Sequence, residues 1–225
     1  IRAEVSMLTA GSVATTEAAG PHITNACRYF DLALNILKPR PAALVAIGGA
    51  SGSGKTSVAR AIAPGLGAVP GAVIVRSDEV RKALFGVSDT DLLPEAAYAE
   101  EWNRRTYMEV TARVKHTLAA GHGCVVDAVH GSADERDEIE AMARHMGIPF
   151  KGIWLEAPEA ILCGRTERRV GDASDAGPAV VTRQLQRGFG RVEWTHVDAS
   201  GGIADVSETV RNILAAGPVQ GSLTL

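Results

Sequence analysis

Short apolar runs alternate with amphipathic segments along most of this chain, and their order predicts the secondary structure. A continuous apolar run predicts a buried parallel strand, because a strand covered on both faces has no polar side. Five such strands are predicted at 42–47, 72–75, 124–126, 152–155 and, with a weaker and edge-like pattern, 192–197. Segments with apolar residues three or four positions apart predict helices. These helices are expected at 56–63, 78–84, 94–120, 132–146, 158–169, 179–187 and 202–215.

The alternation of strands and helices predicts an α/β fold in which a five-stranded parallel sheet lies between two helical layers. Ligands of such sheets bind beyond the carboxyl ends of the strands. Asp78, Asp127, Glu156 and Asp198 each follow or end a predicted strand. We therefore expect four acidic groups at one edge of the sheet, beside whatever ligand binds there. Four acidic groups at one edge favour a catalytic site over a surface that only binds a ligand.

The first forty residues differ from the rest and predict an appendage. Residues 1–23 are rich in Ala, Thr, Ser and Gly without a sustained period, which predicts a loose leader. Residues 24–37 are expected to be helical, and prolines at 39 and 41 end that helix. The predicted division is a leader and helix at 1–40, the main domain at 41–217 and a tail at 218–225.

Composition narrows the class of protein. The chain has 225 residues, of which 46% are hydrophobic, and its formal net charge is −3. The acidic balance argues against nucleic acid as a partner. No apolar stretch approaches the roughly 20 residues of a membrane helix, so no membrane association is expected. Three scattered cysteines without metal-ligand spacing predict reduced thiols and a cytoplasmic location.

The segment from Gly49 to Thr56 matches the phosphate-binding motif G-x-x-x-x-G-K-[ST] in full. A predicted strand precedes it and a predicted helix follows, so its glycines and the helix N-terminus can present amide groups to phosphate. We expect Lys55 to reach the β- and γ-phosphates, as a catalytic group, and Thr56 to hold Mg²⁺. The alternative is a flexible Gly/Ser linker that matches by chance. The predicted nucleotide-binding residues here are Gly49, Ala50, Ser51, Gly52, Ser53, Gly54, Lys55, Thr56 and Ser57.

Asp78 and Arg81 follow the second predicted strand, next to the expected phosphate site. A carboxylate there can accept the proton of a hydroxyl that attacks the γ-phosphate. Arg81 lies three residues later on the same helix face and can hold an anionic or polar group of the acceptor. The alternative for Asp78 is a helix cap without a chemical role.

Asp127 and His130 follow the third predicted strand. A carboxylate after such a strand is the usual partner of Mg²⁺ beside a phosphate loop, but Asp127 can instead face the acceptor or serve only the structure. His130 is a candidate for contact with the substrate. A lone histidine in a loop is more often solvated, and this alternative stays open.

Arg165, Arg168 and Arg169 form a basic cluster that leads into the Gly-bounded loop 171–177. Such arginines can close over the phosphates as a lid and stabilise developing charge, which makes Arg165 and Arg169 candidate catalytic residues. The alternative is a solvated helix face. Arg165 and Asp198 are further candidates for binding ATP. The loop that starts at Asp198 either borders the base of the nucleotide, or Ser200 or Asp198 simply begins the last helix.

Together these residues resemble the small P-loop kinases related to polynucleotide kinase, gluconate kinase and the zeta toxins. More closely, residues 28–215 resemble the ATP-binding C-terminal half of a bacterial two-domain family, in which an aminoglycoside-phosphotransferase-like domain comes first. The resemblance implies a P-loop kinase fold of the nucleoside-kinase type, ATP with Mg²⁺, and an upstream domain whose end is residues 1–20. His130 departs from the bulky apolar residue expected there. The matching segments are 29–33, 44–49, 76–81, 125–129, 154–158, 171–176 and 197–201.

Three functions compete at this point. The first is a kinase that transfers the γ-phosphoryl group of ATP to a hydroxyl of a sugar, nucleoside or antibiotic. The second is a polynucleotide 5′-hydroxyl kinase, which the acidic net charge does not favour. The third is an ATP-binding module without catalysis that regulates a neighbouring domain.

Overall fold

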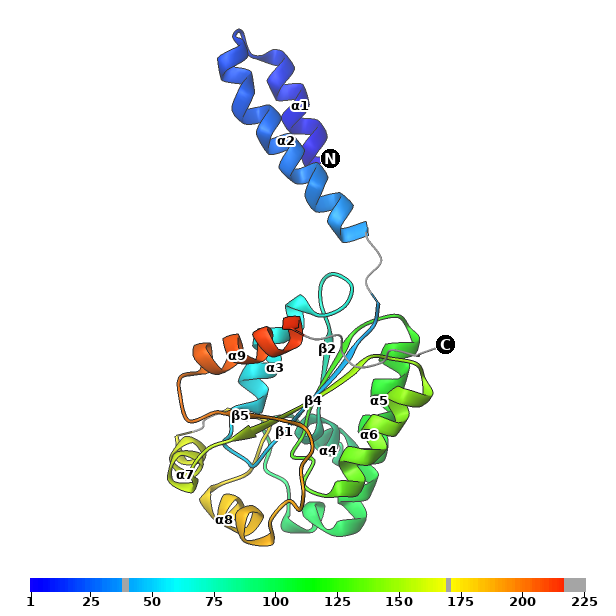
Figure 1. The fold of residues 1–225 in the computed structure, drawn as a ribbon, viewed down its shortest axis with the longest axis vertical. Coiled ribbons are helices and arrows are strands. Elements are labelled where there is room, and N and C mark those ends of the chain that lie inside the picture. The colour runs from blue at the N-terminus through cyan, green and yellow to red at the C-terminus, as the bar shows by residue number, and fades with distance from the viewer. Residues whose placement is uncertain (38–40, 169–170, 217–225) are drawn as a thin grey trace. The chain divides into compact units, whose positions relative to one another are not determined.

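The computed structural model describes residues 1–37, 41–168 and 171–216 (Figure 1). Arg169 and the predicted tail at 218–225 lie outside the described residues. The chain divides into two compact units, Ile1–Arg40 and Pro41–Leu225. Each unit is described by itself.

The second unit is built on one parallel sheet, in which the described strands have the order β2-β3-β1-β4-β5. In the register of the central strand, Ile47 lies opposite Asp127 on one side and Ile153 on the other. The predicted α/β fold with five parallel strands is confirmed. The strands are β1 (Leu44–Gly48), β2 (Val73–Arg76), β3 (Cys124–Asp127), β4 (Phe150–Glu156) and β5 (Thr195–Asp198).

Helices cover both faces of this sheet (Figure 1). The helices of this unit are α3 (Lys55–Ile62), α4 (Ser77–Phe85), α5 (Glu100–Ala119), α6 (Ala133–His145), α7 (Glu159–Glu167), α8 (Pro178–Arg187) and α9 (Ile203–Ala216), with short 3₁₀ turns η1 (Ala63–Gly65) and η2 (Glu95–Tyr98).

Successive residues of β1 point to opposite faces of the sheet, so the central strand contributes to two separate cores. Leu44 and Ala46 pack with α5 and α6, whereas Val45 and Ile47 pack with α3 and α9. All four are completely buried. Burial of an aliphatic side chain contributes about 2 kcal/mol, so the two cores hold β1 and the loop after it in a fixed position.

The long helix predicted at 94–120 is interrupted. The turn η2 ends at Tyr98, Ala99 is extended with φ −61° and ψ 155°, and α5 begins at the next residue. The carbonyl oxygen of Ala97 accepts a hydrogen bond from the Arg81 side chain at 2.9 Å. That carbonyl is thus occupied by a side chain from another helix, and the interruption leaves Tyr98 44% exposed instead of in the buried stripe of α5.

The fifth strand is shorter than predicted and starts at Thr195 rather than at 192. Trp194 explains the difference, because its ring turns into the core and its indole N–H donates to Glu140 at 2.6 Å. The predicted edge position of this strand is confirmed by the strand order.

The first unit is helical from its start, which corrects the predicted loose leader. It consists of α1 (Arg2–Ser12) and α2 (Thr16–Leu37). The Thr15 hydroxyl accepts from the Ala18 amide at 3.2 Å, so α2 begins well before the Gly20-Pro21 pair. Alanine-rich segments have high intrinsic helix propensity even without a clear apolar period. Among the described residues, no helix is long and apolar enough to cross a membrane.

Candidate active site

The loop from Gly49 to Gly54 connects the central strand to α3. Three of its glycines have positive φ, with +131° at Gly49, +84° at Gly52 and +92° at Gly54. A Cβ atom at Gly49 would lie 2.3 Å from the carbonyl oxygen of Leu155, and one at Gly52 would lie 2.5 Å from that of Leu162. The backbone passes too close to β4 and α7 for any larger residue. Because α3 begins directly after the loop, its positive end faces the same place.

Lys55 lies across this loop. Its ammonium group donates to the carbonyl oxygens of Gly49 and Ala50, each at 2.9 Å, and the side chain is buried. Ser53 is also buried, and its hydroxyl has no hydrogen-bond partner within the described residues. Ser57, by contrast, is exposed on α3. The loop therefore offers an ammonium group and an unpaired hydroxyl to an anion.

Thr56 and Asp127 form a pair of oxygen groups beside the loop. The Thr56 hydroxyl donates to Asp127 Oδ2 at 2.6 Å, and Asp127 is buried at the end of β3. Mg²⁺ prefers oxygen ligands and commonly uses one or two protein groups together with substrate phosphates. This pair fits such an ion. Across the described ranges, no group of three or more His, Cys, Asp or Glu residues forms a complete metal site.

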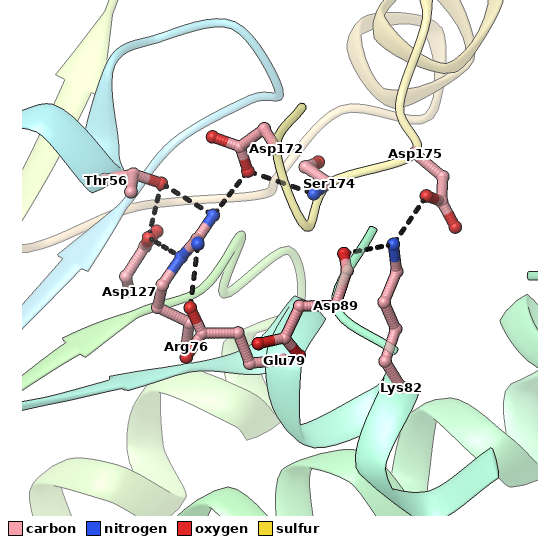
Figure 2. Close-up of polar contacts among 9 residues, drawn as sticks. All are labelled: Thr56, Arg76, Glu79, Lys82, Asp89, Asp127, Asp172, Ser174 and Asp175. Atoms are coloured by element: carbon pink, nitrogen blue, oxygen red, sulfur yellow. Dashed lines mark hydrogen bonds and ion pairs between the residues drawn. The ribbon is translucent and has the colours of Figure 1, made fainter. Parts of the chain in front are cut away.

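Arg76 joins this pair, although the sequence analysis did not single it out (Figure 2). Its Nε donates to Asp127 Oδ2 at 3.2 Å, and its Nη2 lies 3.4 Å from Thr56 Oγ1. The other contacts go to Glu79 at 2.8 Å and to Asp172 at 2.6 Å. Burial lowers the pKa of Arg76, but its bond to Asp172 and the charge of Asp127 outweigh burial and raise it. In the sequence, the one indication of a role for Arg76 is that it directly follows the strand predicted at 72–75.

Asp78 lies in the first turn of α4 and is partly buried. The helix begins at Ser77 after Arg76 and has no side-chain cap, so the capping alternative for Asp78 is wrong. Burial and the charge of Asp127 raise the pKa of Asp78 above its usual range, while a hydrogen bond from Ser174 and the charge of Lys55 act in the opposite direction. Asp78 is thus coupled electrostatically to Lys55 and Asp127.

Arg81 is 6% exposed and lies on the same helix as Asp78. It donates to Ala97 O at 2.9 Å and to Asn103 Oδ1 at 2.8 Å, and its guanidinium lies 5.0 Å from the centre of the Tyr98 ring. Asn103 in turn donates to Glu135 at 2.9 Å. Within the described part of the chain, Arg81 Nε has no hydrogen-bond partner and no carboxylate forms an ion pair with this guanidinium. These partners come from three different helical elements, so sequence spacing does not reveal them.

His130 lies inside the core, which excludes the solvated alternative. It is 1% exposed, and its ring packs edge-on against Tyr107 and Trp194 with centroid distances of 5.7 and 4.9 Å. Burial, assisted by the charges of Lys55 and Arg136, lowers the pKa of His130 to about 3. Neither ring nitrogen has a hydrogen-bond partner among the described residues. Contact between His130 and a substrate stays a prediction.

Arg165 ties α7 to the loop that follows β5. It donates to the carbonyl oxygens of Ala199 at 2.8 Å, Ser200 at 3.4 Å and Gly201 at 2.9 Å. Asp198 shapes the same loop, because its Oδ1 accepts from the Ser200 amide at 2.8 Å, and hydrogen bonds from Ser200 lower its pKa. The structure thus brings together the two residues predicted to bind ATP from this side. Since α9 begins at Ile203, Asp198 does not begin the last helix.

Of the remaining members of the basic cluster, only Arg168 lies within the described residues. Arg168 is exposed and its Nε donates to the carbonyl of Gly164 in its own helix at 2.9 Å. Arg169 is among the residues that are not described. The lid role of these arginines therefore stays a prediction.

The Gly-bounded loop 171–177 is attached through Asp172 to Arg76 and through Asp175 to Lys82 of α4 (Figure 2). Asp175 forms an ion pair with Lys82 at 3.0 Å and accepts from the Leu93 amide at 3.0 Å and the Tyr98 hydroxyl at 2.9 Å. Two other side chains of the loop, Asp172 and Ser174, make the contacts described above. The loop is thus bound to β2, to α4 and to the segment before α5.

The four acidic residues at the sheet edge form two separate pairs. Because β1 occupies the centre of the sheet, Asp78 and Asp127 lie on one side of the phosphate loop, after β2 and β3. Glu156 and Asp198 end β4 and β5 on the other side, where they line a shallow hollow of about 270 Å³. Glu156 also contacts His196 at 2.9 Å. A single cluster of four carboxylates is therefore not formed.

Comparison with known proteins agrees with this architecture. The chain matches an uncharacterised protein of Mycobacterium tuberculosis at 25% identity over 156 residues, which is 68% of this chain and 30% of that relative. It thus spans less than a third of the length of that relative. It also matches an adenylyl-sulfate kinase of Myxococcus xanthus at 31% identity over 120 residues, 52% of this chain and 59% of that one.

A solved structure of the Mycobacterium tuberculosis APS kinase CysC, in complex with AMPPNP and APS, has the same fold. Its TM-score is 0.57 at 18% identity, and the match covers 79% of this chain and 99% of that one. The predicted likeness to P-loop kinases is therefore confirmed for the fold. A protein-family model described as an AAA domain (AAA_33) matches residues 44–190, from the central strand to the end of α8 and slightly beyond. Because that match covers more than half of the chain, the protein belongs to this AAA-domain family.

Proposed function

We propose that this protein is an ATP-dependent phosphotransferase that moves the γ-phosphoryl group of ATP to a hydroxyl of a small molecule. The observation that carries the proposal is the position of Asp78. This carboxylate lies in the first turn of α4, directly after β2, and the charges of both Asp127 and Lys55 act on its pKa. The kinase names among the relatives and structural neighbours support the same class of reaction.

The donor half of the site uses the phosphate loop and the segments on either side. Lys55, which lies across the loop, would hold the β- and γ-phosphates, and the Thr56–Asp127 pair would hold Mg²⁺. A bound Mg²⁺ supplies positive charge to the phosphate oxygens during transfer. Arg165 and Asp198 border the nucleotide on the opposite side, through the loop at 199–201.

The chemical step requires a base near the attacking hydroxyl. The acceptor oxygen forms a bond to the γ-phosphorus while the bond from that phosphorus to the β–γ bridging oxygen breaks, and ADP leaves. The hydroxyl proton passes to the Asp78 carboxylate. A raised pKa makes this carboxylate a better proton acceptor than an exposed aspartate while it is ionised.

Arg81 is the group proposed to select the acceptor. A buried guanidinium is costly without a partner of opposite charge. In the described residues its partners are a carbonyl and an amide oxygen, and one donor has no partner. We therefore propose an acceptor that carries an anionic or strongly polar group next to the hydroxyl that is phosphorylated.

The direct test is turnover of labelled ATP with Mg²⁺ and a panel of acceptors. The panel contains sugars, sugar acids, nucleosides, antibiotics and a short single-stranded oligonucleotide. Replacement of Asp78 by Asn should lower kcat about 100-fold or more while ATP affinity changes little, because only proton transfer is lost. Asp134→Asn is the matched control, since Asp134 is an exposed acidic residue in the first turn of α6.

The outcomes separate the competing functions. Undiminished turnover in Asp78→Asn would contradict the assigned base. Phosphorylation of the oligonucleotide alone would favour a polynucleotide 5′-hydroxyl kinase. Tight ATP binding without transfer to any acceptor would favour a regulatory nucleotide-binding module.

A further inference from the structure

Arg76 contacts the same side-chain oxygen atoms that the proposed metal ion would bind. Asp127 Oδ2 accepts hydrogen bonds from both the Thr56 hydroxyl at 2.6 Å and Arg76 Nε at 3.2 Å. Arg76 Nη2 also lies 3.4 Å from Thr56 Oγ1. A divalent cation needs lone pairs on these same two groups. The guanidinium and the cation therefore compete for shared ligands.

If a metal ion took Asp127 from Arg76, two other carboxylates would still hold the guanidinium. Its Nη1 contacts Glu79 at 2.8 Å, and its Nη2 contacts Asp172 at 2.6 Å (Figure 2). These carboxylates come from α4 and from the loop 171–177, not from the metal pair. Arg76 can therefore give up Asp127 without becoming an unpaired buried charge.

We propose that Arg76 serves as the resident counter-cation of the Thr56–Asp127 pair, so that a divalent metal binds there well only together with nucleotide. The phosphates bring the additional negative charge that allows a metal ion and a guanidinium to share this edge of the site. This inference rests on the proposed function only in taking Thr56 and Asp127 as the metal-facing groups.

A merely structural role for Arg76 makes the opposite prediction. If Arg76 served only to orient Asp127, its removal would leave that carboxylate misplaced and metal binding would weaken. Competition, in contrast, requires that removal of Arg76 strengthen metal binding in the absence of nucleotide. The sign of the change decides between the two.

The experiment is a titration of the nucleotide-free protein with Mn²⁺, in which free Mn²⁺ is followed by electron paramagnetic resonance. Arg76→Gln should bind Mn²⁺ about fivefold or more tightly than the unmodified chain, the size of a typical coupling between sites. With a non-hydrolysable ATP analogue present, the difference should shrink. Arg105→Gln is the matched control, because Arg105 is an exposed arginine on α5 that pairs with Glu101. It removes the same charge from a distant place.

Weaker or unchanged Mn²⁺ binding in Arg76→Gln would overturn the proposal, as would an equal increase in Arg105→Gln. If the glutamine variant does not fold, Arg76→Lys decides, since one ammonium group cannot contact Asp127 and Asp172 as the guanidinium does. It should show a smaller increase in Mn²⁺ affinity, and no increase would overturn the proposal. None of these measurements requires turnover, so failure of the kinase proposal is seen separately.

A second measurement uses hydrogen exchange to follow the position of the loop 171–177. The Ser174 amide donates to Asp172 Oδ1 at 3.1 Å, so its hydrogen exchange reports on the position of Asp172. Exchange there should become faster in both Arg76→Gln and Asp172→Asn. Only the arginine variant should gain Mn²⁺ affinity, because only it removes the competing cation. A gain of equal size in Asp172→Asn would contradict the assignment to Arg76.

Discussion

At the scale of single residues, His130 is a histidine that must stay neutral in the folded protein. Its pKa is lowered from 6.5 to about 3, chiefly by burial. The unfolded chain therefore binds one proton more than the folded chain between these two values. Stability is present above pH 6.5 and is lost as pH falls below it, because protonation favours the unfolded state.

We predict that His130→Phe reduces the loss of folding stability at low pH. An aromatic ring can keep the packing against Tyr107 and Trp194, and the family resemblance indicates a bulky apolar residue at this position. In the unmodified chain His130 should account for about 2 kcal/mol of the stability lost between pH 7.5 and pH 5. Urea unfolding at the two pH values measures it, with the exposed His122→Phe as control. An equal loss of stability in His130→Phe would contradict the prediction.

At the scale of elements, the loop 171–177 depends on one aspartate for its attachment. Asp175 contacts Lys82, the Tyr98 hydroxyl and the Leu93 amide, and Lys82 is completely buried. Partial burial raises the pKa of Asp175, but the hydrogen bonds from Leu93, Lys82 and Tyr98 together outweigh burial and lower it. The loop, α4 and the segment before α5 are thus joined at one carboxylate.

We predict that Asp175→Asn lowers the free energy of unfolding by about 3 kcal/mol, since it leaves the buried Lys82 without its counter-charge. Hydrogen exchange at the Leu93 amide should become faster in the same variant. Asp89→Asn is the control, because the backbone carbonyl of Asp89, not its side chain, accepts from Lys82 at 2.8 Å. If both variants unfold at the same urea concentration, the ion pair does not hold this loop.

Over the whole molecule, the chain divides into two compact units. The residues of the candidate active site, from Gly49 to Asp198, all belong to the second unit. The second unit has its own cores on both faces of the sheet. The first unit is a pair of helices with exposed apolar side chains such as Phe30 and Leu37, the latter 78% exposed. We therefore propose the predicted boundary near residue 40 as a true domain boundary.

Deletion of residues 1–40 should leave a folded protein that binds ATP with nearly unchanged affinity. Since no site residue and no core residue of the second unit is removed, its melting temperature should shift by only a few degrees, the equivalent of about 1 kcal/mol or less. Thermal melting and nucleotide titration of residues 41–225 test this. Loss of cooperative melting or of ATP binding would show that the helices are part of the kinase-like domain.

The parallel α/β fold, the approximate strand positions and the phosphate loop follow from the sequence, because each is encoded by a local apolar period or by a contiguous motif. The helices within residues 1–23 were not predicted, because an alanine-rich helix can form without a strong apolar period. The tertiary structure alone decided the strand order, which separates the four acidic groups into two pairs. It also placed Arg76 on the metal pair and joined Arg81, Asn103 and Glu135. These contacts join residues 22 to 51 positions apart in the chain, and such distant pairs leave no periodic signal in the sequence.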